Sequence, residues 1–114
     1  LPPAELQYFD DEATRLIALR SGRADVIVQP NAQLVYIAAR DGDIRRVGTL
    51  SAGWPERSDV AVTTRKGSGL AEAVTEAING AILDGSYAAV LQRWQLTEET
   101  LPESRTNPPG LPKY

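Results

Sequence analysis

The chain has 114 residues, of which 42% are hydrophobic and 24% charged, and its net charge is −3. This composition is typical of one globular domain, and an acidic balance without a basic run argues against a nucleic-acid partner. Cys and His are both absent from the sequence, which excludes disulfides, thiolate nucleophiles, a Ser-His-Asp triad and the commonest metal ligands. We expect no metal, no cofactor and no enzymatic activity, and any enzymatic role would have to rest on carboxylates, Lys or Tyr.

The first half of the chain alternates between strand-like and helix-like patterns. Strands are predicted at residues 5–9 (ELQYF), 24–29 (ADVIVQ) and 44–50 (IRRVGTL), which are apolar runs with β-branched residues. Helices are predicted at residues 10–22, capped by Asp10 or Asp11, and at residues 32–42, which Asn31 can cap. A β-α-β-α-β order predicts an α/β fold, with a parallel sheet and helices on both of its faces.

The second half begins with a Gly/Pro loop at residues 51–58, which contains Trp54, and continues with a predicted strand at residues 59–64. An unbroken apolar stripe from Leu70 to Ile82 predicts a long helix. After Asp84-Gly85, Ser86 is predicted to cap a last helix whose core face holds Tyr87 and Trp94. The proline-rich residues after Leu96 predict an extended tail on the surface, in which Glu98 and Glu99 have no evident partner.

Two stretches carry a family resemblance. They are ALRSGRADVIV (residues 18–28) and VAVTTRKGSGLAEAVTEAINGAILDGSYAAVLQRW (residues 60–94). Together they resemble the extracellular solute-binding proteins of family 3, the amino-acid-binding subunits of ABC importers. The most specific element is Asp-Gly-x-Tyr-x-x-x-Leu-x-x-Trp after the long helix. The resemblance covers nearly the whole chain.

The resemblance implies a particular domain organisation. Such proteins have two hinged α/β lobes that close over a ligand, and this chain is similar to the C-terminal half of one. Residues 1–57 then form the later part of the second, inserted lobe, residues 58–100 return to the first lobe, and residues 101–114 are the tail. The implied partners are a membrane ABC permease and a missing N-terminal half, or another chain, that completes the lobes.

The resemblance also directs attention to Gln29, Pro30 and Asn31. In the family a carboxylate after the second strand holds the ligand's α-ammonium, and here that position is Pro30, which has no side-chain acceptor. Gln29 and Asn31 each offer an amide that can bind a polar group. Trp54 can stack on a ligand. We therefore predict a ligand site of Gln29, Pro30, Asn31 and Trp54, with Asn31 equally suited to be a helix cap.

The leading function is capture of a small polar solute, such as an amino acid or an amine, for an ABC importer. The protein would then act in the periplasm or outside the cell, after removal of a signal peptide, and could be lipid-anchored. Two alternatives share the implied fold. One is the ligand-sensing domain of a receptor, and the other is an enzyme similar to cyclohexadienyl dehydratases, which requires a carboxylic acid in its cleft.

Overall fold

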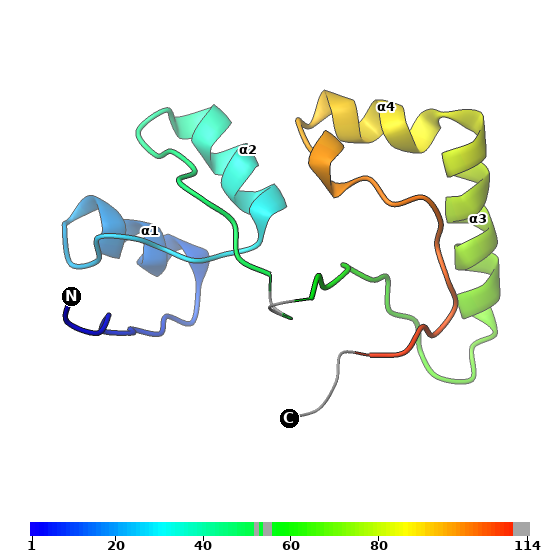
Figure 1. Cartoon of the computed structure of the whole chain (residues 1–114), viewed down its shortest axis with the longest axis horizontal. Helices are drawn as coiled ribbons and strands as arrows, with labels where there is room; N and C mark the ends of the chain where they lie inside the picture. Colours follow the sequence, from blue (N-terminus) through cyan, green and yellow to red (C-terminus); the bar gives the residue numbers. More distant parts are fainter. Residues whose placement is uncertain (52, 54–55, 111–114) are drawn as a thin grey trace. The chain divides into compact units, whose positions relative to one another are not determined.

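A computed structural model describes residues 1–51, 53 and 56–110 (Figure 1). The chain divides into two compact units, Leu1–Pro30 and Asn31–Tyr114. The helical elements of the described residues are α1 (Glu12–Arg20) in the first unit, and α2 (Asn31–Asp41), α3 (Leu70–Asp84), α4 (Ser86–Arg93) and the 3₁₀ turn η1 (Thr97–Glu99) in the second.

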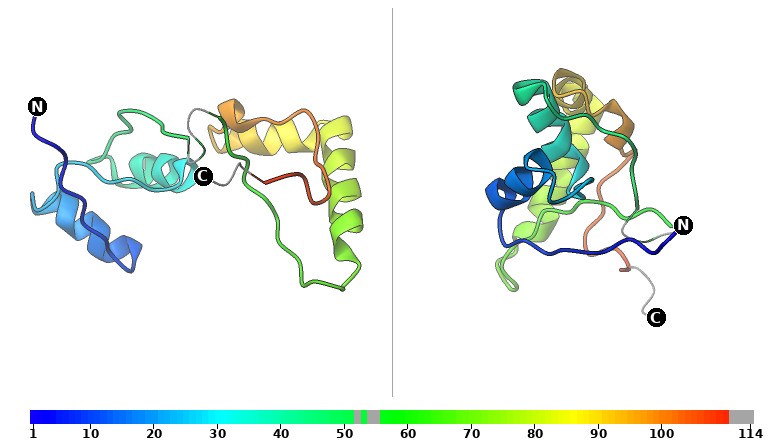
Figure 2. Two further views of the ribbon diagram at one scale, coloured as in Figure 1. Left: turned by 60° about the horizontal axis from the view of Figure 1, so that its bottom comes forward. Right: turned by 90° about the vertical axis from the view of Figure 1, so that its left-hand side faces the viewer.

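The predicted α/β fold with a parallel sheet is wrong, because the described residues contain helices and no strand. The segments predicted as strands, residues 5–9, 24–29, 44–50 and 59–64, run without regular secondary structure (Figure 2). Most of their apolar side chains are exposed to solvent, and Val60 is 93% exposed. The physical reason is that a strand needs ladder hydrogen bonds from a distant segment, whereas a helix makes its backbone bonds within itself.

Local hydrogen bonding explains α1 in the first unit. The Asp11 side chain accepts from the Thr14 backbone N–H at 2.7 Å, so Asp11 is the N-cap, one of the two candidates, Asp10 and Asp11, that the sequence offered. At the other end, the Ser21 N–H donates to Ile17 at 2.9 Å, and Gly22 has a φ of +73°, which glycine adopts without strain. Leu16 and Ala18 of α1 are buried.

In the second unit, α3 and α4 are adjacent in the sequence and pack against each other through a sharp corner at Gly85 (Figure 1). The corner is closed by Asp84, whose carboxylate accepts from the Ser86 N–H at 2.8 Å. The prediction that Ser86 is the cap is therefore wrong: Gly85 is the N-cap residue, and Ser86 is the first residue of α4. Trp94 was also predicted in the core, but it is 50% exposed, because it follows α4 at the rim of a hollow described below.

The tail after η1 lies along α3. The Asn79 side chain of α3 makes two bonds with the backbone of Ser104, donating to its carbonyl at 3.0 Å and accepting from its N–H at 2.7 Å. Thr106 donates to the Thr75 hydroxyl at 2.8 Å. The Leu101 N–H donates to the Tyr87 hydroxyl at 3.1 Å. Side-chain bonds from α3 and α4 thus fix this extended segment.

Candidate functional site

One hollow lies within the first unit, and two of the four predicted ligand residues, Gln29 and Pro30, line it. It encloses about 690 Å³ and is lined by residues 4–9, 15 and 23–30. We call it the Gln29 hollow. Its volume falls in the range of small-molecule sites. Its walls are the N-terminal extended segment, the segment that follows α1, and the Arg15 side chain of α1 itself.

Gln29 has one satisfied and one unsatisfied end. Its side-chain oxygen Oε1 accepts from Nη1 of Arg15 at 3.4 Å, while its amide nitrogen Nε2 is buried and has no hydrogen-bond partner. The Arg15 guanidinium can only donate, so it fixes which end of the amide faces it. A buried donor without an acceptor costs about 1–3 kcal/mol. One residue in the wall of the hollow therefore has a buried N–H donor without an acceptor.

Charged side chains of both signs line the same hollow. Arg15 is half-buried, and Arg23 is an exposed second guanidinium. Glu5 and Asp25 supply carboxylates from the two extended segments. None of these four charged residues was among the ligand residues predicted from the sequence. Arg15 lies 14 residues before Gln29, and no local pattern in the sequence links the two.

Pro30 also lines the Gln29 hollow, at the end of its second wall. It can contribute only its ring and its carbonyl oxygen, since proline has no N–H and no polar side chain. The resemblance implies a carboxylate at this position, but the sequence has proline there. Asp25 and Glu5 are the acidic groups of this hollow.

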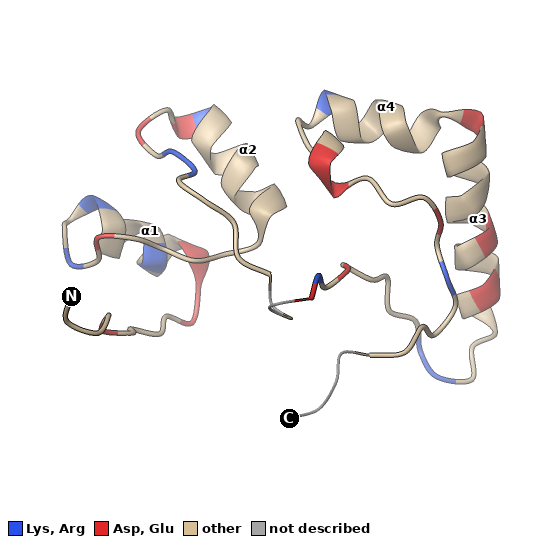
Figure 3. Cartoon of the chain, in the orientation of Figure 1, with Lys and Arg blue, Asp and Glu red and all other residues tan. Residues whose placement is uncertain are grey.

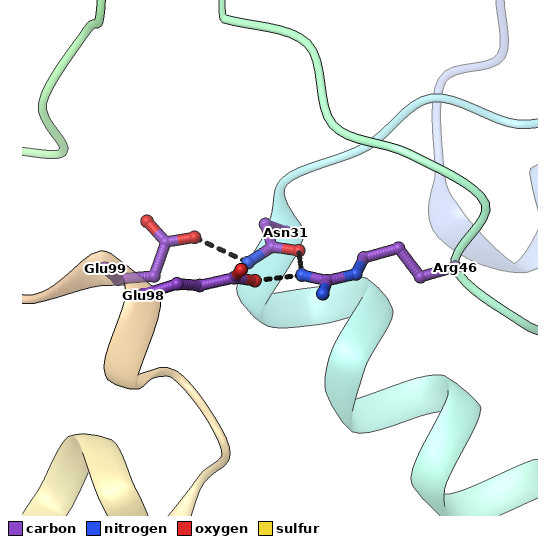
Figure 4. Close-up of polar contacts among 4 residues, drawn as sticks. All are labelled: Asn31, Arg46, Glu98 and Glu99. Atoms are coloured by element: carbon purple, nitrogen blue, oxygen red, sulfur yellow. Dashed lines mark hydrogen bonds and ion pairs between the residues drawn. The ribbon is translucent and has the colours of Figure 1, made fainter.

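Asn31 lies in the second unit, as the first residue of α2, and its side chain is already engaged there (Figure 4). Its amide nitrogen donates to Glu99 at 2.5 Å, and its amide oxygen accepts from Arg46 at 2.9 Å. Arg46 is also paired with Glu98. We call these four residues the Asn31 clamp. It joins the start of α2 to η1.

The Asn31 clamp changes the titration of Glu98. The hydrogen bond from Arg46, followed by the attraction of its positive charge, lowers the pKa of the Glu98 carboxyl. The sequence suggested that Glu98 and Glu99 are tail charges without partners. In the structure both carboxylates have side-chain partners. Arg46 lies 52 residues before Glu98, so this contact depends on tertiary structure. Trp54, the fourth predicted ligand residue, lies outside the described residues.

In the described part of the chain, no group of three or more acidic side chains is arranged to hold a metal ion. None of the helices in residues 1–51, 53 and 56–110 combines the length and hydropathy that a bilayer crossing requires. In comparisons with known proteins, no family model, no curated protein and no solved structure matches the chain.

Proposed function

We propose that the chain captures a small polar solute in the Gln29 hollow, as part of an extracytoplasmic binding protein that serves an ABC importer. The observation that carries the proposal is the buried Nε2 of Gln29, which has no partner beside a hollow of about 690 Å³. The importer and the location outside the cytoplasm rest on the two sequence stretches that resemble the family, residues 18–28 and 60–94.

The charges of the hollow favour a zwitterion. An α-amino acid carries a carboxylate, which suits the Gln29 donor and the Arg23 guanidinium. Its ammonium suits the carboxylates of Asp25 and Glu5, which replace the acidic group that Pro30 cannot supply. Recognition of an amino acid is therefore compatible with proline at residue 30.

The partners follow from the same proposal. The docking partner of the loaded protein is a membrane permease. The exposed apolar segments, in which Val28 is 71% and Val47 is 73% exposed, require cover from a further part of the same polypeptide or from another chain. The proposal assigns that cover to the rest of the binding protein.

The test is to purify the protein under native conditions, denature it, and identify the released small molecules by mass spectrometry. We expect an α-amino acid or a similar small zwitterion. The variant Gln29→Leu removes the unpartnered donor while keeping an apolar body of similar length. It should release no solute and should unfold at the same or a higher temperature, because a buried unsatisfied group has been removed.

The matched control is Gln33→Leu, which changes an exposed glutamine of α2. It should retain the solute. Release of equal amounts from Gln29→Leu and wild type contradicts the site. If the native protein instead converts the bound solute into another compound over time, the result indicates the dehydratase-like enzyme.

A further inference from the structure

A second hollow lies within the second unit, between the C-terminal half of α2 and the end of α4. It encloses about 310 Å³, and its walls include Tyr36 and Arg40 from α2, and Arg93, Trp94 and Gln95 from the end of α4. The Tyr36 and Trp94 rings lie 6.2 Å apart between centroids, tilted by 57°. Each of the two aromatic residues is 50% exposed, so this pair presents aromatic surface to solvent.

One arginine guanidinium lies close to each of the two aromatic rings. Arg40 lies 5.6 Å from the Tyr36 ring centroid, and Arg93 lies 5.9 Å from that of Trp94. They are the basic residues in the last turns of α2 and α4, the blue ends of those helices in Figure 3. Arg40 is neutralised by Asp41, whose hydrogen bond raises the Arg40 pKa. Within the described residues, Arg93 forms no hydrogen bond or ion pair through its side chain. The hollow therefore has one uncompensated positive charge, at Arg93.

The backbone beside Arg93 is strained. α4 ends in two backbone bonds typical of a Schellman motif, from Gln95 N–H to Gln92 and from Leu96 N–H to Leu91. The motif requires a left-handed residue, which is usually glycine, but this position holds Gln95 with a φ of +59°. A residue other than glycine in this conformation has an energetic cost, and such outliers gather at ligand sites. Gln95 lines the hollow, where its amide can contact a ligand.

We propose that this hollow, named the Trp94 hollow, binds a small organic anion with a flat apolar body, of the aromatic carboxylate class. The Tyr36 and Trp94 rings contact the flat body, and the Arg93 guanidinium, held on the indole face, donates to the carboxylate. A cation is disfavoured by Arg93, and an inorganic anion leaves the aromatic walls unused. The proposal does not depend on the Gln29 hollow or on its solute.

The test uses benzoate as the probe, titrated into the ¹⁵N-labelled 114-residue chain while the Trp94 indole N–H is followed by NMR. Benzyl alcohol lacks the charge and acetate lacks the ring. We expect a saturable shift with benzoate, and binding of both other compounds at least about tenfold weaker. Equal affinity for benzyl alcohol or for acetate overturns the proposal.

Variants separate a binding role from a structural one. Arg93→Gln should weaken benzoate binding about tenfold, whereas Arg105→Gln, which changes an exposed arginine of the tail, should leave it unchanged. Gln95→Gly should raise the unfolding temperature by relieving the left-handed strain and should also weaken benzoate binding. Unchanged benzoate affinity in both Arg93→Gln and Gln95→Gly would falsify the assignment.

Discussion

Gln29 in the first unit and Asn79 in the second both carry a side-chain amide. The two amides differ in how many of their polar atoms have a hydrogen-bond partner. Asn79 uses both ends of its amide on Ser104, and so attaches the tail to α3. Gln29 uses only its oxygen, on Arg15, and its nitrogen is buried without a partner. A fully satisfied amide stabilises the fold, whereas a half-satisfied one beside a hollow lowers stability until a ligand completes it. This difference separates a structural polar group from a candidate binding group.

The largest expected effect tests whether the two units are stabilised independently. Leu16 is 5% exposed in α1, so Leu16→Ala should cost the first unit about 2–5 kcal/mol, through lost burial and a residual cavity. Amide hydrogen exchange of residues 12–20 should accelerate, while exchange at Ser104 stays unchanged. Leu83→Ala, at a side chain that is 88% exposed, is the control and should alter neither. Faster exchange at Ser104 in Leu16→Ala contradicts independent units.

The next prediction concerns the satisfied amide. Asn79→Leu removes both bonds to Ser104 and leaves the Ser104 N–H without its partner, at an expected cost of about 1–3 kcal/mol to attachment of the tail. Exchange of the Ser104 amide should accelerate about tenfold or more. Gln29→Leu is the matched change in the first unit and should not destabilise the protein. Destabilisation by both leucine variants would show that Gln29 is also a structural amide.

The helices could be predicted from the sequence, and the packing could not. α1 and α3 lie where capping by Asp11 and the apolar stripe from Leu70 place them, because a helix is determined by residues within four positions of each other. The segments at 24–29 and 59–64 have strand-like patterns, but a pattern does not specify the partner that a strand requires. The predicted sheet failed for that reason.

The candidate ligand site, like the fold, could be predicted from the sequence only in part. Gln29 and Pro30 line a hollow, as expected of ligand residues, and whether they bind a ligand remains a prediction. Asn31 is only one residue further on, but its side chain is held by Arg46 and Glu99. Those partners lie 15 and 68 residues away in the sequence. No local motif indicates contacts of that range.

A smaller effect is expected at the start of α1. The backbone N–H of Thr14 lowers the pKa of the Asp11 carboxyl, followed by the Thr14 side chain. Because the folded-state pKa is below the unfolded value, the stabilisation of α1 is complete above the unfolded pKa and is lost as the pH falls through the folded one. Asp11→Ala should reduce helical circular dichroism at pH 7 and remove this part of its acid dependence. Asp10→Ala is the control, since Asp11 supplies the cap.

The smallest effect is expected at the Asn31 clamp, whose ion pair is exposed to solvent and weakened by salt. Arg46 lowers the pKa of Glu98, so the contribution of the clamp is present above the unfolded pKa of that carboxyl. It is lost as the pH falls through the folded value. Glu98→Gln keeps the shape and removes the charge, so it should abolish this acid-induced change, read from the Asn31 side-chain amide signals by NMR. Glu103→Gln, in an exposed carboxylate 3.8 Å from Arg105, should leave those signals unchanged. If Glu98→Gln does not alter the titration of the Asn31 amide, Arg46 is not coupled to Glu98 in solution.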